Sequence, residues 1–146
     1  MNYIGKPISR EEDLRLLQGR GRYTQDVNAL NQAQAYVLRS PAAHAKIQSI
    51  ETTAAKKAPG VLGIFTGDDI HKSGLGRLKP AAPGKRSDGS PGFVCPQPLL
   101  AEKRVRYAGE AVAFIVAETV NQSKDAAELI EVNFDQLPVV TSVDYA

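Results

Sequence analysis

Short runs of apolar residues along this chain predict a series of β-strands. Two of the runs, 33–39 and 131–135, alternate between apolar and polar positions, as strands with one buried face do. Two others, 61–65 and 111–118, are apolar almost throughout, and the longer one is typical of a strand covered on both faces. The predicted strands are residues 33–39, 47–51, 61–65, 111–118 and 131–135.

The last two strands are separated by residues 120–130, which have the spacing of an amphipathic helix. Ser123, Ala127 and Ile130 fall near one face, which we expect to be buried. The side chains expected to face solvent are Lys124, Asp125 and Glu128.

The order strand, helix, strand therefore occurs twice, at residues 47–65 and 111–134. In the segment 111–134, the connection between the two strands is long enough for them to pair in parallel, and the crossover would be right-handed. In the segment 47–65, the connection is barely long enough for parallel pairing. We predict an α+β fold, a small mixed β-sheet with helices packed on one face.

Capping residues predict three further short helices. Residues 52–58 should form a helix that Pro59-Gly60 stops. Asp68-Asp69 resembles a metal-binding doublet, but its place after Thr66 favours helix capping instead. In an N-terminal arm, 1–30, Ser9 and Glu12 have the spacing of a capping box that opens a helix ended by Gly19. The apolar side of that helix is Leu14, Leu16 and Leu17.

Residues 72–98 are rich in Gly, Pro, Ser and charged residues. Such a composition buries too little apolar surface to offset the entropy of ordering the chain. We predict a long, flexible Gly/Pro-rich loop. A loop that is mobile or docked against a partner is favoured over one with a binding role of its own.

Composition narrows the function classes. The 146 residues, 42% hydrophobic, suit one soluble domain, 1–146. A net charge of +2 with interspersed signs gives no support to nucleic acid binding. No apolar run is long enough to span a membrane, and the single cysteine, Cys95, cannot form an internal disulfide, so we expect a cytoplasmic protein.

The residues that follow the loop form a recognisable signature. The sequence VRYAGEAVAFIVAET at 105–119, followed by DAAELI at 125–130, resembles the α/β hammerhead domain of the molybdenum hydroxylase large subunit. Residues 10–23 resemble the opening of the same domain, and RSP at 39–41 with HAKI at 44–47 resembles its "RSPHAHAxI" motif. The resemblance covers nearly the whole chain. Two positions depart from it: Ala42 replaces a usual His, and Ala111 a usual Pro.

The resemblance implies a parent enzyme of the xanthine dehydrogenase, aldehyde oxidase and aerobic carbon monoxide dehydrogenase family. Such enzymes use molybdopterin-bound molybdenum and pass electrons to iron–sulfur and FAD subunits or domains. In the family, the cofactor motifs and the catalytic glutamate follow the hammerhead. The resemblance therefore implies a noncatalytic scaffold that supports the molybdenum-binding domains of the same subunit, with no cofactor or metal held by this chain. The resemblance also implies that pocket residues outside this chain decide the substrate, which could be carbon monoxide, a purine, an aldehyde or an N-heterocycle.

Gly109, Glu110 and His44 are the candidate interdomain contacts. A carboxylate beside a glycine turn can bond to backbone donors or to a neighbouring domain, or it can transfer protons. Structural or interdomain bonding is favoured, because the motif holds no second titratable group and no nucleophile. Two alternatives are a stand-alone interaction module with this fold and a small enzyme working through Glu110 and a histidine.

Overall fold

The computed structural model describes residues 4–80 and 84–145, with side-chain surroundings described as far as residue 144. The chain separates into two compact units, Met1–Gln32 and Ala33–Ala146, so the boundary falls close to the predicted end of the arm. Each unit is described by itself.

The first unit contains helix α1 (Asp13–Leu17) and the 3₁₀ turn η1 (Thr24–Asp26). The predicted capping box is wrong, because Glu12 is itself the N-cap residue and makes no capping bond. Its carboxylate instead contacts Arg15 one turn along the helix, at 3.1 Å. Gly19 follows the helix with a φ of +67°, as a helix-ending glycine does.

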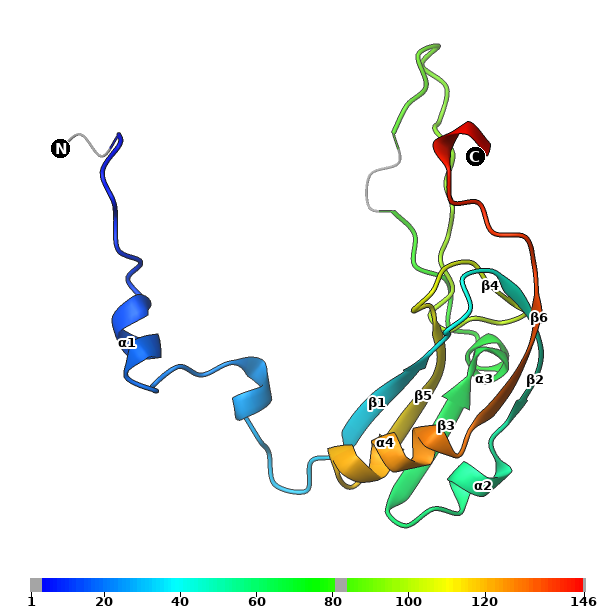
Figure 1. Cartoon of the computed structure of the whole chain (residues 1–146), viewed down its shortest axis with the longest axis horizontal. Coiled ribbons are helices and arrows are strands. Elements are labelled where there is room, and N and C mark those ends of the chain that lie inside the picture. The colour runs from blue at the N-terminus through cyan, green and yellow to red at the C-terminus, as the bar shows by residue number, and fades with distance from the viewer. Residues whose placement is uncertain (1–3, 81–83, 146) are drawn as a thin grey trace. The chain divides into compact units, whose positions relative to one another are not determined.

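The second unit contains two three-stranded antiparallel sheets (Figure 1). One has the order β1 (Gln34–Arg39), β5 (Ala111–Ala117), β3 (Val61–Thr66). The other has the order β4 (Arg104–Val105), β2 (Ala45–Glu51), β6 (Glu131–Gln136). The short strand β4 was not predicted.

The predicted parallel pairing of the last two strands is wrong. Strands β5 and β6 lie in different sheets, and β6 pairs antiparallel with β2. A long crossover permits parallel pairing without requiring it. The partner is decided by side chains, because the apolar positions of β6 match those of β2. The matched pairs are Ile47 with Phe134 and Ile50 with Val132.

Helix α4 (Val120–Glu128) covers one face of the β1-β5-β3 sheet (Figure 1). The Thr119 hydroxyl caps it by accepting the Gln122 backbone N–H at 3.2 Å. As predicted, Ser123, Ala127 and Ile130 are buried. Together with Ala113, Ile115 and Ile64 of the sheet, Ala127 and Ile130 belong to the main core. The remaining helices are α2 (Thr53–Lys56) and α3 (Gly67–Lys72), and a 3₁₀ turn, η2 (Val143–Tyr145), lies near the end of the chain.

A second core cluster lies where the two sheets meet. It contains Ala45 of β2, Val105 of β4 and Val112 of β5, with the inward side chains of β6 against it. The predicted α+β class is therefore confirmed, with two sheets in place of one.

Within the second unit, β5 is covered on one face and not on both faces as predicted. Ala113, Ile115 and Ala117 are buried beneath α4, but Phe114 keeps 37% of its surface exposed and Val116 is only half-buried. Within the second unit, helices cover one side of this sheet, and the apolar residues on its other side are only partly buried.

The described part of 72–98 folds back on itself as a narrow ribbon. Leu78 and Gln97 exchange backbone hydrogen bonds of 2.9 Å, and a second bridge joins Lys85 to Pro91 (Figure 1). Pro83, one of the prolines in the predicted loop, lies outside the described residues. Flexibility of the loop stays a prediction.

Candidate functional site

Residues 107–110 form a tight turn between β4 and β5. The Glu110 backbone N–H donates to the Tyr107 carbonyl over 3.2 Å, which closes the turn. Gly109 has a φ of +89°, a region that glycine enters without steric cost. A side chain there would meet no neighbour within 4 Å, so the turn requires glycine for its conformation rather than for space.

Three hydrogen bonds fasten this turn to the end of β1. The Gly109 N–H donates to the Ser40 carbonyl and the Ser40 N–H to the Glu110 carbonyl, both at 2.8 Å. The Arg39 guanidinium donates to the Gly109 carbonyl at 2.9 Å. The buried Ser40 hydroxyl bonds both backbone groups of Ala42 at 3.0 Å. Sequence reasoning gave Ser40 no role, although a hydroxyl residue before proline is a signal for such a local turn.

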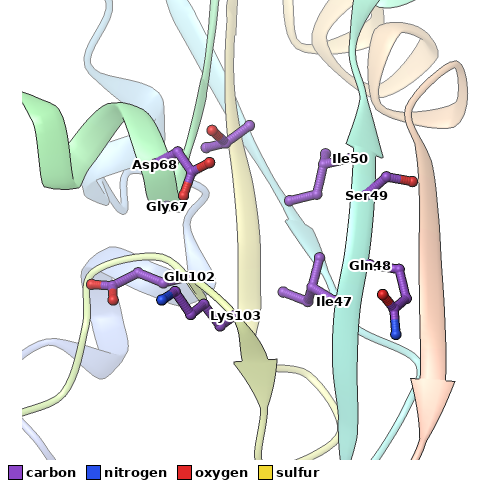
Figure 2. Close-up of a pocket in the computed structure, with 9 residues that line it drawn as sticks. Ile47, Gln48, Ser49, Ile50, Gly67, Asp68, Glu102 and Lys103 are labelled. Carbon is purple, nitrogen blue, oxygen red and sulfur yellow. The ribbon is translucent and has the colours of Figure 1, made fainter.

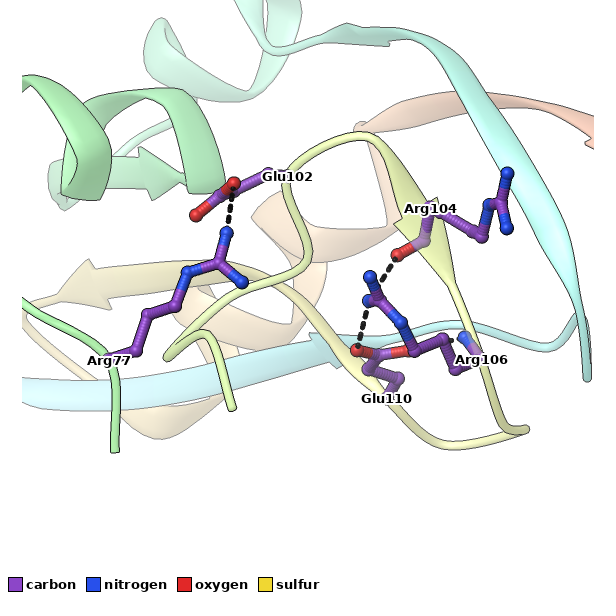
Figure 3. A network of polar contacts seen from close by, with 5 residues as sticks. All are labelled: Arg77, Glu102, Arg104, Arg106 and Glu110. Carbon is purple, nitrogen blue, oxygen red and sulfur yellow. Dashed lines mark hydrogen bonds and ion pairs between the residues drawn. The ribbon is translucent and has the colours of Figure 1, made fainter. Parts of the chain in front are cut away.

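The Glu110 carboxylate is buried and bonded within its own turn. It accepts the Arg106 backbone N–H at 2.5 Å, and its other oxygen lies 3.8 Å from the Arg106 guanidinium (Figure 3). Its side chain is 8% exposed, whereas that of Arg106 is 56% exposed. The short charge-assisted bond therefore dominates, because a half-exposed ion pair contributes little. This is the backbone bonding expected of a structural Glu110.

His44 joins the start of β2 to the segment after β6. Its ring Nδ1 lies 2.7 Å from the Pro138 carbonyl, and the Leu137 N–H donates to the His44 carbonyl at 2.9 Å. Because a carbonyl only accepts, Nδ1 carries the hydrogen. His44 thus ties two segments of this unit together. Contacts of Gly109, Glu110 or His44 with another domain stay predictions.

A cavity of about 320 Å³ lies beside Glu110. Its lining includes Arg77, Arg106 and Tyr107, together with Cys95 of the ribbon, and no histidine among the residues that the structure describes there. In the neighbouring network, Arg77 donates to the Glu102 carboxylate at 2.8 Å (Figure 3). The geometry therefore does not bring Glu110 together with the histidine that the small-enzyme alternative requires.

A second cavity, of about 270 Å³, lies between β2 and the start of α3 (Figure 2). Asp68 and Glu102 line it, but Asp69 turns back to cap α3. The Thr66 backbone N–H and hydroxyl both donate to the Asp69 carboxylate at 2.8 Å, and these bonds hold the pKa of Asp69 below its ordinary value. The capping interpretation of Asp69 is confirmed.

The side chains that could bind a metal ion are scattered over the described part of the chain. Over residues 4–80 and 84–145, no three His, Cys, Asp or Glu side chains are placed to share a metal ion. The single thiol, Cys95, is exposed. Whether this chain contacts the molybdenum cofactor of a parent enzyme stays a prediction. Separately, none of the helices in the described part of the chain has the length and apolar character to cross a bilayer.

Residues 18–138 match the family model of the aldehyde oxidase and xanthine dehydrogenase a/b hammerhead domain. The chain belongs to this hammerhead family. A 41% identical relative, the nicotine 6-hydroxylase large subunit of Paenarthrobacter nicotinovorans, matches over 95% of this chain and 16% of its own length. The chain thus spans about one sixth of that relative.

Solved structures of hammerhead relatives have the same fold. Quinoline 2-oxidoreductase from Pseudomonas putida 86 is 38% identical with a TM-score of 0.83, covering 99% of this chain and 18% of its own. A copper- and molybdenum-containing carbon monoxide dehydrogenase is 36% identical with a TM-score of 0.76, covering 92% of this chain and 16% of its own. The resemblance inferred from the sequence motifs is confirmed.

The hammerhead motifs have definite places in this structure. The VRYAGE motif runs from the last residue of β4 through the Glu110 turn. The RSP motif begins at the last residue of β1, and its Ser40 bonds to this turn. Ala42, which replaces a usual His, is buried in the second core cluster. Its methyl group packs there with Ala45 and Ala101.

Proposed function

We propose that this chain is a structural domain within the large subunit of a molybdenum hydroxylase. The observation that carries the proposal is the extent of the match. It covers nearly all of this chain but only about one sixth of the relative's length. The remaining five sixths would then supply the residues that bind molybdopterin and substrate. The iron–sulfur and FAD subunits would be partners of the whole assembly, in the cytoplasm.

Support for a structural role comes from the candidate residues. The Glu110 carboxylate bonds to a backbone N–H of its own turn, and the His44 ring to a carbonyl of its own unit. A proton-transfer group needs a hydrogen-bonding path to a reacting atom. Both side chains instead hold segments of the fold together. A stand-alone interaction module is not favoured, because the matched relatives carry this fold inside a much longer subunit.

A chimeric subunit tests the proposal. This chain would replace the matched 140 residues of the nicotine 6-hydroxylase large subunit, which would be expressed with its partner subunits. We expect the chimera to assemble, bind molybdenum and oxidise the recipient's own substrate, because the proposal places the substrate pocket outside the exchanged part. The isolated chain should purify without molybdenum, iron or flavin.

Two results would contradict the structural role. One is stoichiometric molybdenum in the isolated chain, measured by elemental analysis. The other is turnover by the isolated chain that Glu110→Gln abolishes while circular dichroism shows an unchanged fold. The chimera could also be as soluble as the unaltered recipient subunit and still fail to assemble with the partner subunits. That result would show that this chain cannot replace the recipient's own domain.

A further inference from the structure

Two neighbouring cavities in the second unit share part of their lining. One is the cavity of about 320 Å³ beside Glu110, and the other has a volume of about 340 Å³ and includes Arg104 of β4 in its wall. Arg77, Pro98 and Arg106 line both cavities. Arg77 comes from the ribbon and Arg106 from the residue after β4, so two arginines from separate segments stand at the boundary between the cavities (Figure 3).

Positive charge is in excess around these cavities. Their combined lining holds four cationic and two acidic residues, which are Arg77, Lys103, Arg104, Arg106, Glu102 and Glu110. The excess of two positive charges equals the formal net charge of the whole chain, +2. A concave wall concentrates the electric field of its charges, so this excess favours an anionic ligand.

The two carboxylates hold the arginines and leave most of their donors unused. Nη2 of Arg77 donates to the Glu102 carboxylate at 2.8 Å. Nη1 of Arg106 lies 3.8 Å from the Glu110 carboxylate and 3.4 Å from the Arg104 carbonyl oxygen. Within residues 4–80 and 84–145, the other nitrogens of these two guanidinium groups make no hydrogen bond. Each planar guanidinium can therefore bind an oxyanion in addition to its carboxylate.

The size of the charge excess favours a phosphate group over a carboxylate. A phosphate monoester carries about −1.5 to −2 charges at neutral pH, which matches the excess, and its several oxygens can accept from both arginines. A carboxylate would neutralise only half of the excess. The cavity beside Glu110 also has an apolar wall of Phe93, Val94 and Pro96, against which the non-polar part of an ester can lie.

We infer that Arg77 and Arg106 bind the phosphate group of a small molecule at the boundary between the two cavities. Arg104 contributes charge rather than a bond, because Figure 3 shows its guanidinium pointing away from that of Arg106. All the lining residues belong to the second unit. The inference concerns this chain alone and does not depend on the proposed function.

Isothermal titration calorimetry of the full chain in a dilute buffer without phosphate tests the site. The probes are inorganic phosphate and phenyl phosphate. Arg77→Gln and Arg106→Gln should each weaken binding about tenfold or more, because each removes charge-assisted hydrogen bonds to the phosphate. The matched control is Arg86→Gln, which removes the same charge from a ribbon residue that lines neither cavity. It should change the affinity by less than about twofold, because it removes no contact with the phosphate.

The two probes distinguish the sources of the phosphate group. Tighter binding of phenyl phosphate than of inorganic phosphate supports a phosphate ester that uses the apolar wall, and equal binding supports free phosphate. The inference is overturned if neither probe binds at millimolar concentration. It is also overturned if Arg86→Gln weakens binding as much as Arg77→Gln, because the phosphate would then respond only to the overall charge of the chain.

Thermal unfolding of each variant separates loss of binding from loss of the fold. The side chains of Arg77 and Glu102 are 46% and 25% exposed, so breaking their ion pair should lower stability little. If Arg77→Gln nevertheless unfolds, Arg77→Lys replaces it, because lysine keeps the charge and lacks the planar fork. This variant should still weaken binding several-fold, and an unchanged affinity would overturn the inference. None of these outcomes affects the proposed function, which the chimera tests separately.

Discussion

Replacement of Glu110 by glutamine tests how much the charge on the buried carboxylate stabilises the turn. The carboxylate accepts one backbone N–H at 2.5 Å with its side chain 8% exposed. A hydrogen bond to a charged group contributes about 1.5–3 kcal/mol, and a neutral one about 0.5–1.5 kcal/mol. The glutamine side chain would keep the acceptor and lose the charge. We therefore expect a loss of about 1–2 kcal/mol in the free energy of unfolding.

Two variants control for the charge change itself. Glu102→Gln removes a carboxylate that also binds an arginine, at 2.8 Å, but in a pair whose side chains are 46% and 25% exposed. It should cost about 0–1 kcal/mol, because solvent screens the pair. Arg106→Gln keeps the backbone N–H that Glu110 accepts, so it should also cost less than about 1 kcal/mol.

Thermal and urea unfolding at neutral pH provide the assay. For a chain of this size, about 1–2 kcal/mol corresponds to a fall of about 2–8 °C in the melting temperature. The reasoning is refuted if Glu110→Gln costs no more than Glu102→Gln. It is also refuted if Arg106→Gln costs as much as Glu110→Gln, because the exposed ion pair would then be the main contribution.

Three further predictions follow from single residues. Because the folded-state pKa of Asp69 lies below 3.8, its capping bonds stabilise the fold above that pH and are lost as the pH falls through the folded pKa. Between pH 7 and pH 3, the free energy of unfolding should therefore fall less for Asp69→Asn than for Asp68→Asn. An equal fall for both variants would contradict the capping role of Asp69. Gly109→Ala should cost about 1–2 kcal/mol because of its positive φ, whereas Gly76→Ala, whose φ is not in that region and whose surroundings are open, should cost almost nothing. Native Cys95, which is exposed, should react with a maleimide as fast as in denatured chain, and a rate slowed tenfold would show that something covers the ribbon.

The sequence determined the features that depend on near neighbours along the chain. The buried face of α4 follows from the 3.6-residue period, and the capping bonds of Asp69 from a spacing of three residues. The turn at Gly109 was recognisable because its glycine and carboxylate stand directly before an apolar strand. The motifs around it also identified the family, since they occur in order along most of the chain.

Only the tertiary structure decided which strands meet. The helix between β5 and β6 is long enough for parallel pairing, yet β6 pairs with β2, whose apolar side chains match its own. The two-residue strand β4 exists only because β2 lies beside it. Strand β5 has the sequence of a strand buried on both faces, but the elements of the second unit cover only one face. Pairing and coverage depend on residues far apart in sequence, so local patterns show that β5 has two apolar faces and cannot show what lies against the second.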